Sequence, residues 1–198
     1  MNVAEHFPDP PTDLKRPGPQ SLVLGGGCFW CTEAVFLAVD GVTAVVPGYA
    51  GGSADTAHYE AVCSGRTGHA EVIRIDYDGS RTSAGQLLKI FFAVAHDPTQ
   101  LNRQGNDRGP QYRSVIFFRD DEEATLARDY IALLDRSGHF STPLVTTLEP
   151  LQAFYPAEPE HHDYAARHPL QPYILFAARP KVAKLAEYFP QQLKGALR

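Results

Sequence analysis

Residues 25–31 read Gly-Gly-Gly-Cys-Phe-Trp-Cys and lie between an apolar stretch, residues 21–24, and a helix-like run, residues 32–39. A strand, a glycine hinge and the start of a helix are therefore predicted to meet at Cys28. The N–H groups left unpaired at a helix N-terminus favour an anion, and a thiolate is one. We therefore expect Cys28 to have a lowered pKa and to act as a nucleophile near neutral pH.

A second cysteine, Cys31, makes a redox cycle possible. Residues i and i+3 on a helix have Cβ atoms about 5–6 Å apart, whereas a disulfide needs roughly 3.5–4.5 Å between them. Oxidation must therefore distort the first helical turn, and we expect a strained bond that is easily reduced. Such a bond suits catalytic turnover better than a structural role.

Other interpretations of the cysteine pair were weighed. Both could be small buried hydrophobic residues, but a Cys-x-x-Cys directly after three glycines disfavours this. A structural zinc site would add Cys63 and His69, whose spacing is loose for a ligand pair. A dinucleotide-binding loop would need a third glycine where Trp30 stands.

The chain as a whole has the size and charge of a single globular domain. Its 198 residues predict an extended Pro-rich arm over residues 1–20 and one catalytic domain over residues 21–198. A net charge of −5 with scattered basic residues argues against nucleic-acid binding. We find no bilayer-spanning stretch and no apolar signal core. With three cysteines, unlike a secreted disulfide scaffold, the chain is expected to be cytoplasmic with reduced thiols.

Strand and helix patterns alternate irregularly along the chain. Without strict βαβ alternation they favour an α+β fold over a doubly wound sheet. The final third, rich in proline, is predicted to be largely a wrapping tail. The predicted elements are strands at 68–78, 114–119 and 144–148, helices at 83–95 and 121–136, and loops at 47–52 and 96–113.

Glu71 is the most informative acidic residue. In the alternating strand it shares a face with Ile73 and Ile75. Burial there would disfavour the charged form and raise the pKa, which would make Glu71 a candidate proton donor near pH 7. Alternatively, Glu71 lies at the strand end, in water or paired with Arg66, and the alternation leaves both possibilities open.

Aromatic residues flank the candidate nucleophile. Phe29 and Trp30 cannot point in one direction on a helix, so at least one should line the space around Cys28. An aromatic wall would suit a thioether methyl group. Tyr59 and Tyr112 lie in loop-like segments, where a phenol can donate a hydrogen bond to a ligand oxygen or simply pack.

The adjacent histidines and the third cysteine are not expected to belong to a site. The adjacent pair His161 and His162 is expected to be exposed, and no helical carboxylate–histidine spacing supports a metal site, so no metal is predicted. Cys63 is expected to be a packed thiol.

Several motifs together resemble those of the A-type peptide methionine sulfoxide reductases, in that family's order, over residues 20–165. They are Gly27-Cys28-Phe29-Trp30, Gly48-Tyr49-x-Gly51-Gly52, Gly65-x-Thr67-Gly68-His69-Ala70-Glu71, His96-Asp97-Pro98-Thr99, Asn102-Arg103-Gln104-Gly105-Asn106-Asp107 and Gln111-Tyr112-Arg113-Ser114.

The resemblance implies a two-layer α+β sandwich with a mixed sheet and flanking helices. It implies that methionine S-sulfoxide, free or in proteins, is reduced to methionine without a cofactor. It also implies a role for each matching residue: Cys28 as nucleophile, Glu71 as acid, Tyr59 and Tyr112 as ligands of the sulfoxide oxygen, Phe29 and Trp30 as the wall around the methyl group, and Asp107 in the polar network.

The chain departs from the family pattern at its recycling cysteines. Many members have glycine at the position of Cys31 and recycling cysteines near the C-terminus, whereas no cysteine follows Cys63 here. A Cys28 sulfenic acid would then condense with Cys31, or less favourably with Cys63, and thioredoxin or a similar dithiol would reset the disulfide. The roles of His161 and Tyr164 stay open.

Two rival classes of function also stay open. A general thiol–disulfide oxidoreductase would need the cysteine pair but neither Glu71 nor a methyl pocket. A non-enzymatic zinc-binding module would use Cys28, Cys31, Cys63 and His69.

Overall fold

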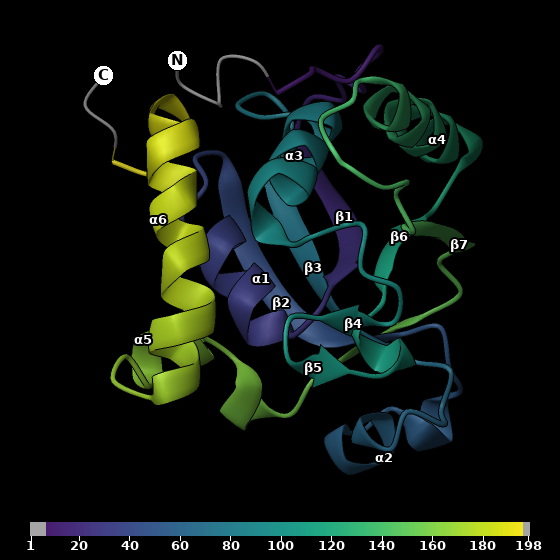
Figure 1. Ribbon diagram of the computed structural model, residues 1–198, viewed down its shortest axis with the longest axis vertical. Helices are drawn as coiled ribbons and strands as arrows, with labels where there is room; N and C mark the ends of the chain where they lie inside the picture. The colour runs from purple at the N-terminus through teal and green to yellow at the C-terminus, as the bar shows by residue number, and fades with distance from the viewer. Residues whose placement is uncertain (1–6, 196–198) are drawn as a thin grey trace.

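The computed structural model describes residues 7–195, and its centre is a six-stranded sheet (Figure 1). The strand order is β7-β6-β1-β3-β2-β8, with β6 and β7 parallel and the other neighbours antiparallel. The strands are β1 Pro19–Gly26, β2 Val42–Ala50, β3 Ala70–Asp78, β6 Ser114–Phe118, β7 Thr147–Pro150 and β8 Phe154–Pro156; β4 Arg103–Gln104 and β5 Asp107–Arg108 form a separate ribbon. The sheet is mixed, as predicted.

Helices cover one face of this sheet. In Figure 1, α6 runs beside α1, and α4 lies at the opposite end of the layer. The α-helices are α1 Phe29–Leu37, α2 Tyr59–Cys63, α3 Ala84–Ile90, α4 Asp121–Arg136, α5 Tyr164–Arg167 and α6 Arg179–Tyr188. Two π-helical segments are η3 Phe91–Ala95 and η6 Ile174–Ala178, and the 3₁₀-helices are η2 Ala54–Thr56, η4 Pro110–Tyr112, η5 Pro159–His161 and η7 Pro190–Gln192.

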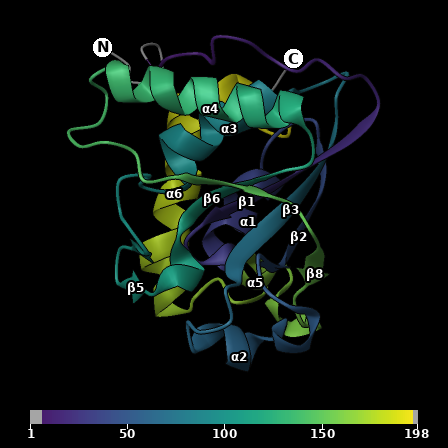
Figure 2. The same cartoon turned by 90° about the vertical axis from the view of Figure 1, so that its right-hand side faces the viewer.

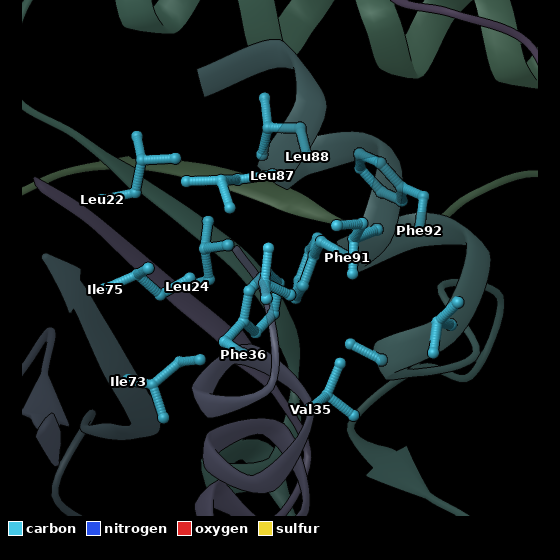
Figure 3. Close-up of a cluster of buried hydrophobic side chains, with 14 of the residues drawn as sticks. Leu22, Leu24, Val35, Phe36, Ile73, Ile75, Leu87, Leu88, Phe91 and Phe92 are labelled. Carbon is cyan, nitrogen blue, oxygen red and sulfur yellow. The ribbon is translucent and has the colours of Figure 1, made fainter. Parts of the chain in front are cut away.

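The period-two pattern of the central strands determines which side chains enter the main core. Leu24 and Ile73 point toward the helices and contact the cluster around Phe36 (Figure 3). Their neighbours Val23 and Val72 belong to a smaller cluster on the opposite face, under residues 151–154. The result is a two-layer α+β sandwich, which confirms the expected fold class; Figure 2 shows the molecule at right angles to Figure 1.

Local capping signals place two helices where the sequence predicts them. The Ser83 side chain accepts a hydrogen bond from the Gln86 N–H and begins α3, which continues as η3 to Ala95. Asp120 accepts from the Glu123 N–H and begins α4.

Two other predictions need correction or extension. The loop predicted at 47–52 is wrong for residues 47–50, because these continue β2 beside β3, and residues 48–50 also pair with β8; Gly48 lies opposite Val72 and Pro156. The final third does wrap around the domain, but it also contains a helix: α6 continues the π-helical segment η6 without a break, and Pro180 lies just after this segment.

The N-terminal arm lies against the helices from residue 7 onward. The Tyr130 hydroxyl donates to the Pro8 carbonyl, and Asp13 accepts from the Gly85 N–H. Residues 1–6 of the predicted arm and 196–198 of the tail lie outside the described residues. None of the helices described is long and apolar enough to cross a membrane.

Candidate active site

Cys28 occupies the junction between β1 and α1. It is the N-cap residue of α1 and is 8% exposed. The preceding Gly27 has φ +85°, and a Cβ there would lie 2.5 Å from the Cβ of Gln104. Only glycine accommodates both this backbone conformation and this contact, so the glycine segment brings the loop carrying Gln104 close to the thiol.

Glu71 lies on the helix-facing side of β3 and is 2% exposed. Its Oε2 accepts a hydrogen bond from the N–H of Phe29, the first residue of α1, at 3.1 Å. Burial raises the pKa of Glu71 to about 8. The buried interpretation is therefore correct, and Arg66 lies exposed.

The expectation of a lowered Cys28 pKa is wrong. Burial raises the pKa of the Cys28 thiol, and its hydrogen bond with Cys31 and the negative charge of Glu71 raise it further. The N–H of Phe29, which a thiolate was expected to use, instead donates to Glu71. In the protein without substrate, the first N–H of α1 therefore stabilises the Glu71 side chain and not a Cys28 thiolate.

Cys31 has the more acidic thiol of the pair. Its hydrogen bond with Cys28 lowers the pKa of Cys31 to about 7, and its Sγ lies 3.8 Å from the Tyr173 hydroxyl. Both cysteines are free thiols. Cys63 is exposed at the end of α2 and hydrogen-bonded to Tyr59, so the expectation of a packed thiol is wrong.

A cavity of about 680 Å³ opens beside the two sulfurs. Its lining includes Cys28, Cys31, Asp107, Tyr173, Phe176 and Lys181. The Tyr173 hydroxyl donates a hydrogen bond to Asp107, which places Asp107 in a polar network at the site. Phe176 is 82% exposed at this cavity.

Of the two aromatic residues after Cys28, Trp30 is the one that packs against the cluster that contains the cysteines. It packs against the cluster of Cys28 and Cys31, whereas Phe29 is fully buried in the main core behind it. The Trp30 Nε1–H donates to His161 Nδ1 at 3.2 Å. His161 is 6% exposed, so the expectation of an exposed histidine is wrong for it.

Both candidate tyrosine donors lie near this cluster. Tyr112, in η4, packs against the cluster that contains both cysteines, and the centroid of the Tyr59 ring lies 4.3 Å from that of the His161 ring. Burial raises the pKa of both phenols, which therefore keep their protons at neutral pH. Each can donate a hydrogen bond to a ligand oxygen.

The ring of His69 is engaged away from the cysteines. Its Nε2 lies 2.9 Å from the Ser53 carbonyl, and its Nδ1 accepts from the Gly52 N–H. Within residues 7–195, no group of three or more His, Cys, Asp or Glu side chains is arranged to hold a metal ion. The arrangement therefore gives no support to the zinc-binding alternative.

Comparison with known proteins identifies the family. The model of the family "Peptide methionine sulfoxide reductase" matches residues 20–193. A peptide methionine sulfoxide reductase MsrA from Trichodesmium erythraeum is 49% identical over 175 residues, which are 88% of this chain and 98% of the relative. The chain belongs to the peptide methionine sulfoxide reductase family.

Solved structures of this family share the fold. Methionine sulfoxide reductase A of Corynebacterium diphtheriae superposes with a TM-score of 0.72 at 33% identity, covering 79% of each chain. Mxr1 from Saccharomyces cerevisiae in complex with Trx2 superposes with a TM-score of 0.50 at 25% identity, covering 75% of this chain and 86% of that one.

Sequence reasoning missed two residues of this reductase's site. Tyr173 links Cys31 to Asp107, and Glu158 accepts from both the Tyr49 hydroxyl and the Tyr59 N–H. Both lie after residue 150, where proline-rich composition was the main signal. The fold of the chain brings both residues to the site, and no local sequence pattern marks them.

The raised pKa of Glu71 predicts how stability depends on pH. A carboxyl whose pKa rises from 4.5 to about 8 on folding contributes stability that is complete below pH 4.5 and lost as pH rises through 8. Glu71→Gln removes this loss but keeps an acceptor for the Phe29 N–H. We expect the variant to exceed the parent in unfolding free energy by a few kcal/mol above pH 8, and the excess to disappear toward pH 4.5.

Denaturant unfolding across this pH range measures the difference. The matched control is Glu60→Gln, which changes an exposed glutamate on α2 and should follow the parent throughout. A Glu71→Gln difference that is constant with pH would contradict the assigned pKa.

Proposed function

We propose that this chain reduces the S epimer of methionine sulfoxide, free or in proteins, to methionine. The observation that carries the proposal is the buried Glu71, with a pKa of about 8, bonded to the first N–H of the helix that Cys28 caps. Glu71, as proton donor, and Cys28, as nucleophile, are thus both held at the start of α1. A general thiol–disulfide oxidoreductase needs the thiols but has no use for this acid.

The first step transfers oxygen from the substrate to Cys28. Glu71 donates its proton to the sulfoxide oxygen, which makes the sulfur electrophilic, and the Cys28 sulfur attacks it. An S–S bond forms as the S–O bond of the sulfoxide breaks, and the oxygen leaves as water with the protons of Glu71 and the Cys28 thiol. The water oxygen then bonds to the Cys28 sulfur, the S–S bond breaks to release methionine, and the remaining proton returns to Glu71, so that Cys28 becomes a sulfenic acid. The substrate sulfur gains two electrons and the Cys28 sulfur loses two.

The protonation states of Glu71 and Cys28 are coupled through charge. A negative charge on Glu71 would raise the Cys28 pKa further. With a pKa of about 8, Glu71 is mostly protonated at neutral pH and in that form does not oppose a Cys28 thiolate. The protonated acid therefore serves both reactants, because it can donate to the sulfoxide oxygen and adds no charge beside the thiol.

The remaining predicted residues bind the substrate in this proposal. Trp30, which contacts the cluster of both cysteines, packs against the sulfoxide methyl, with the buried Phe29 behind it. Tyr59 and Tyr112, neutral because burial raises their pKa, donate to the sulfoxide oxygen. Asp107 acts through its hydrogen bond with Tyr173. Aromatic wall and donors on different sides make the site chiral.

Recycling uses Cys31 and an external dithiol. With a pKa of about 7, the Cys31 thiol ionises readily and attacks the Cys28 sulfenic acid, forming a disulfide and releasing water. A dithiol protein such as thioredoxin then reduces the disulfide by exchange. A relative has been solved in complex with Trx2. We place the protein in the cytoplasm, because this cycle needs a reducing compartment.

The function is tested by a single turnover without external reductant. The reduced protein is incubated with each epimer of methionine sulfoxide, and methionine formed and thiols lost are measured. We expect about one methionine per chain and the loss of two thiols with the S epimer, and none with the R epimer. Cys28→Ser should abolish both signals.

Equal turnover of the two epimers would contradict the stereochemical assignment. No methionine from either epimer, with intact thiols that still reduce protein disulfides, would instead support the general oxidoreductase.

The acid role of Glu71 predicts a large rate effect. Glu71→Gln keeps a hydrogen-bond donor but has no transferable proton, so the rate of methionine release should fall by ~10²–10⁴-fold. Rapid-quench measurement of the first turnover isolates this step from recycling. Glu60→Gln serves as the exposed control. A Glu71→Gln protein that releases methionine at the parental rate would refute the assignment.

A further inference from the structure

Helix α1 carries a buried carboxylate, Glu33, that takes no part in the proposed reaction. Glu33 is 2% exposed and lies one turn after Trp30 on the same side of the helix. Its Oε1 accepts a hydrogen bond from the Asp163 N–H at 2.8 Å. Its Oε2 has no hydrogen-bond partner among residues 7–195, and a cavity of about 270 Å³ lies beside it.

The contact of Glu33 fixes an unusual backbone conformation. Asp163 has φ +53° and ψ +33°, in the left-handed region that residues other than glycine rarely adopt. This conformation turns the chain into α5, which begins at Tyr164. Burial raises the pKa of Glu33 to about 7, and the N–H groups of Asp163 and Tyr164 oppose that rise by stabilising the carboxylate.

The turn held by Glu33 carries the residues that pack around Trp30. The Tyr164 ring stacks on Trp30 with ring centroids 3.8 Å apart and planes 7° apart. Two residues before the turn, His161 accepts the Trp30 Nε1–H. One helix thus presents both Trp30 and the carboxylate that anchors the residues stacked on it.

We propose that Glu33 is a positioning residue for the aromatic wall. As a buried acceptor it ties the turn at Asp163 to α1, and the turn presses Tyr164 against Trp30. The orientation of Trp30 toward the substrate methyl is set in this way. The inference rests on the proposed function for the role of Trp30 alone, because the link between Glu33 and Trp30 exists without substrate.

Two substitutions separate this role from general stabilisation of a buried site. Glu33→Gln keeps a carbonyl oxygen to accept the Asp163 N–H, whereas Glu33→Met has a similar length and no such acceptor. Trp30 is the only tryptophan of the chain, so its fluorescence reports the wall directly. Glu187→Met, at an exposed glutamate on α6, is the matched control.

In the reduced protein without substrate, Glu33→Met should change the Trp30 emission and make it more accessible to a soluble quencher. With methionine S-sulfoxide and dithiothreitol, its KM should rise roughly tenfold, at the lower end of what one apolar contact contributes, with little change in kcat. Glu33→Gln should recover most of both properties, and Glu187→Met should match the parent.

Tyr164→Leu provides a variant in which Glu33 stays paired. It should reproduce the changes in quenching and KM, and adding Glu33→Met to it should cause little further change, because both act through one contact. If Glu33→Met does not fold, Tyr164→Leu still tests the contact with Trp30 through which Glu33 is proposed to act.

Parental quenching and KM in Glu33→Met or in Tyr164→Leu would overturn the proposal. So would a Glu33→Gln protein as impaired as Glu33→Met, since the acceptor would then be irrelevant. If the parent shows no reductase activity, the proposed function fails, while the quenching measurements still test the link between Glu33 and Trp30.

Discussion

The hydrogen bond from the Phe29 N–H to Glu71 joins the sheet to the helix that Cys28 caps. A helix leaves its first N–H groups unpaired, and a carboxylate buried in a sheet face needs donors. Each group therefore satisfies the other at the point where β3 passes the start of α1. This contact holds the acid next to the residue that follows the nucleophile, and the proposed chemistry depends on it.

The same contact makes the reactivity of Cys28 conditional. Burial raises the pKa of the Cys28 thiol, and Glu71 takes the Phe29 N–H that a thiolate could have used, so the thiol keeps its proton in the empty site. Cys31, which benefits from the hydrogen bond with Cys28, carries the lower pKa. A buried thiol that keeps its proton is a weak nucleophile, so Cys28 in the empty site is protected from other electrophiles.

Features that depend on local sequence patterns were predictable from the sequence. The alternation along β3 placed Glu71 on the same face as Ile73, although it left open whether Glu71 is buried, and the capping pair at Ser83 marked the start of α3. The direction in which the Cys28 pKa shifts was not predictable. The helix start is visible in the sequence, but the burial that raises the pKa depends on the fold.

Contacts between distant segments account for most of what the sequence did not show. Gly48 continues a strand because β3 and β8 pair with it on both sides. His161 and Tyr173 lie 133 and 145 residues after Cys28 in the chain, and only the wrapping of the final third brings them to Trp30 and Cys31. No local pattern around either residue marks it as part of a site.

The disulfide formed by one turnover tests the central claim, that Cys28 and Cys31 act as one redox pair beside Glu71. The reduced protein is treated with one equivalent of methionine S-sulfoxide, remaining thiols are alkylated, and a protease that cleaves after aromatic residues separates Cys28 from Cys31 for mass spectrometry. The account predicts a Cys28–Cys31 disulfide with Cys63 alkylated. A Cys28–Cys63 disulfide, or methionine formation with Cys28 still alkylated as a free thiol, would contradict it.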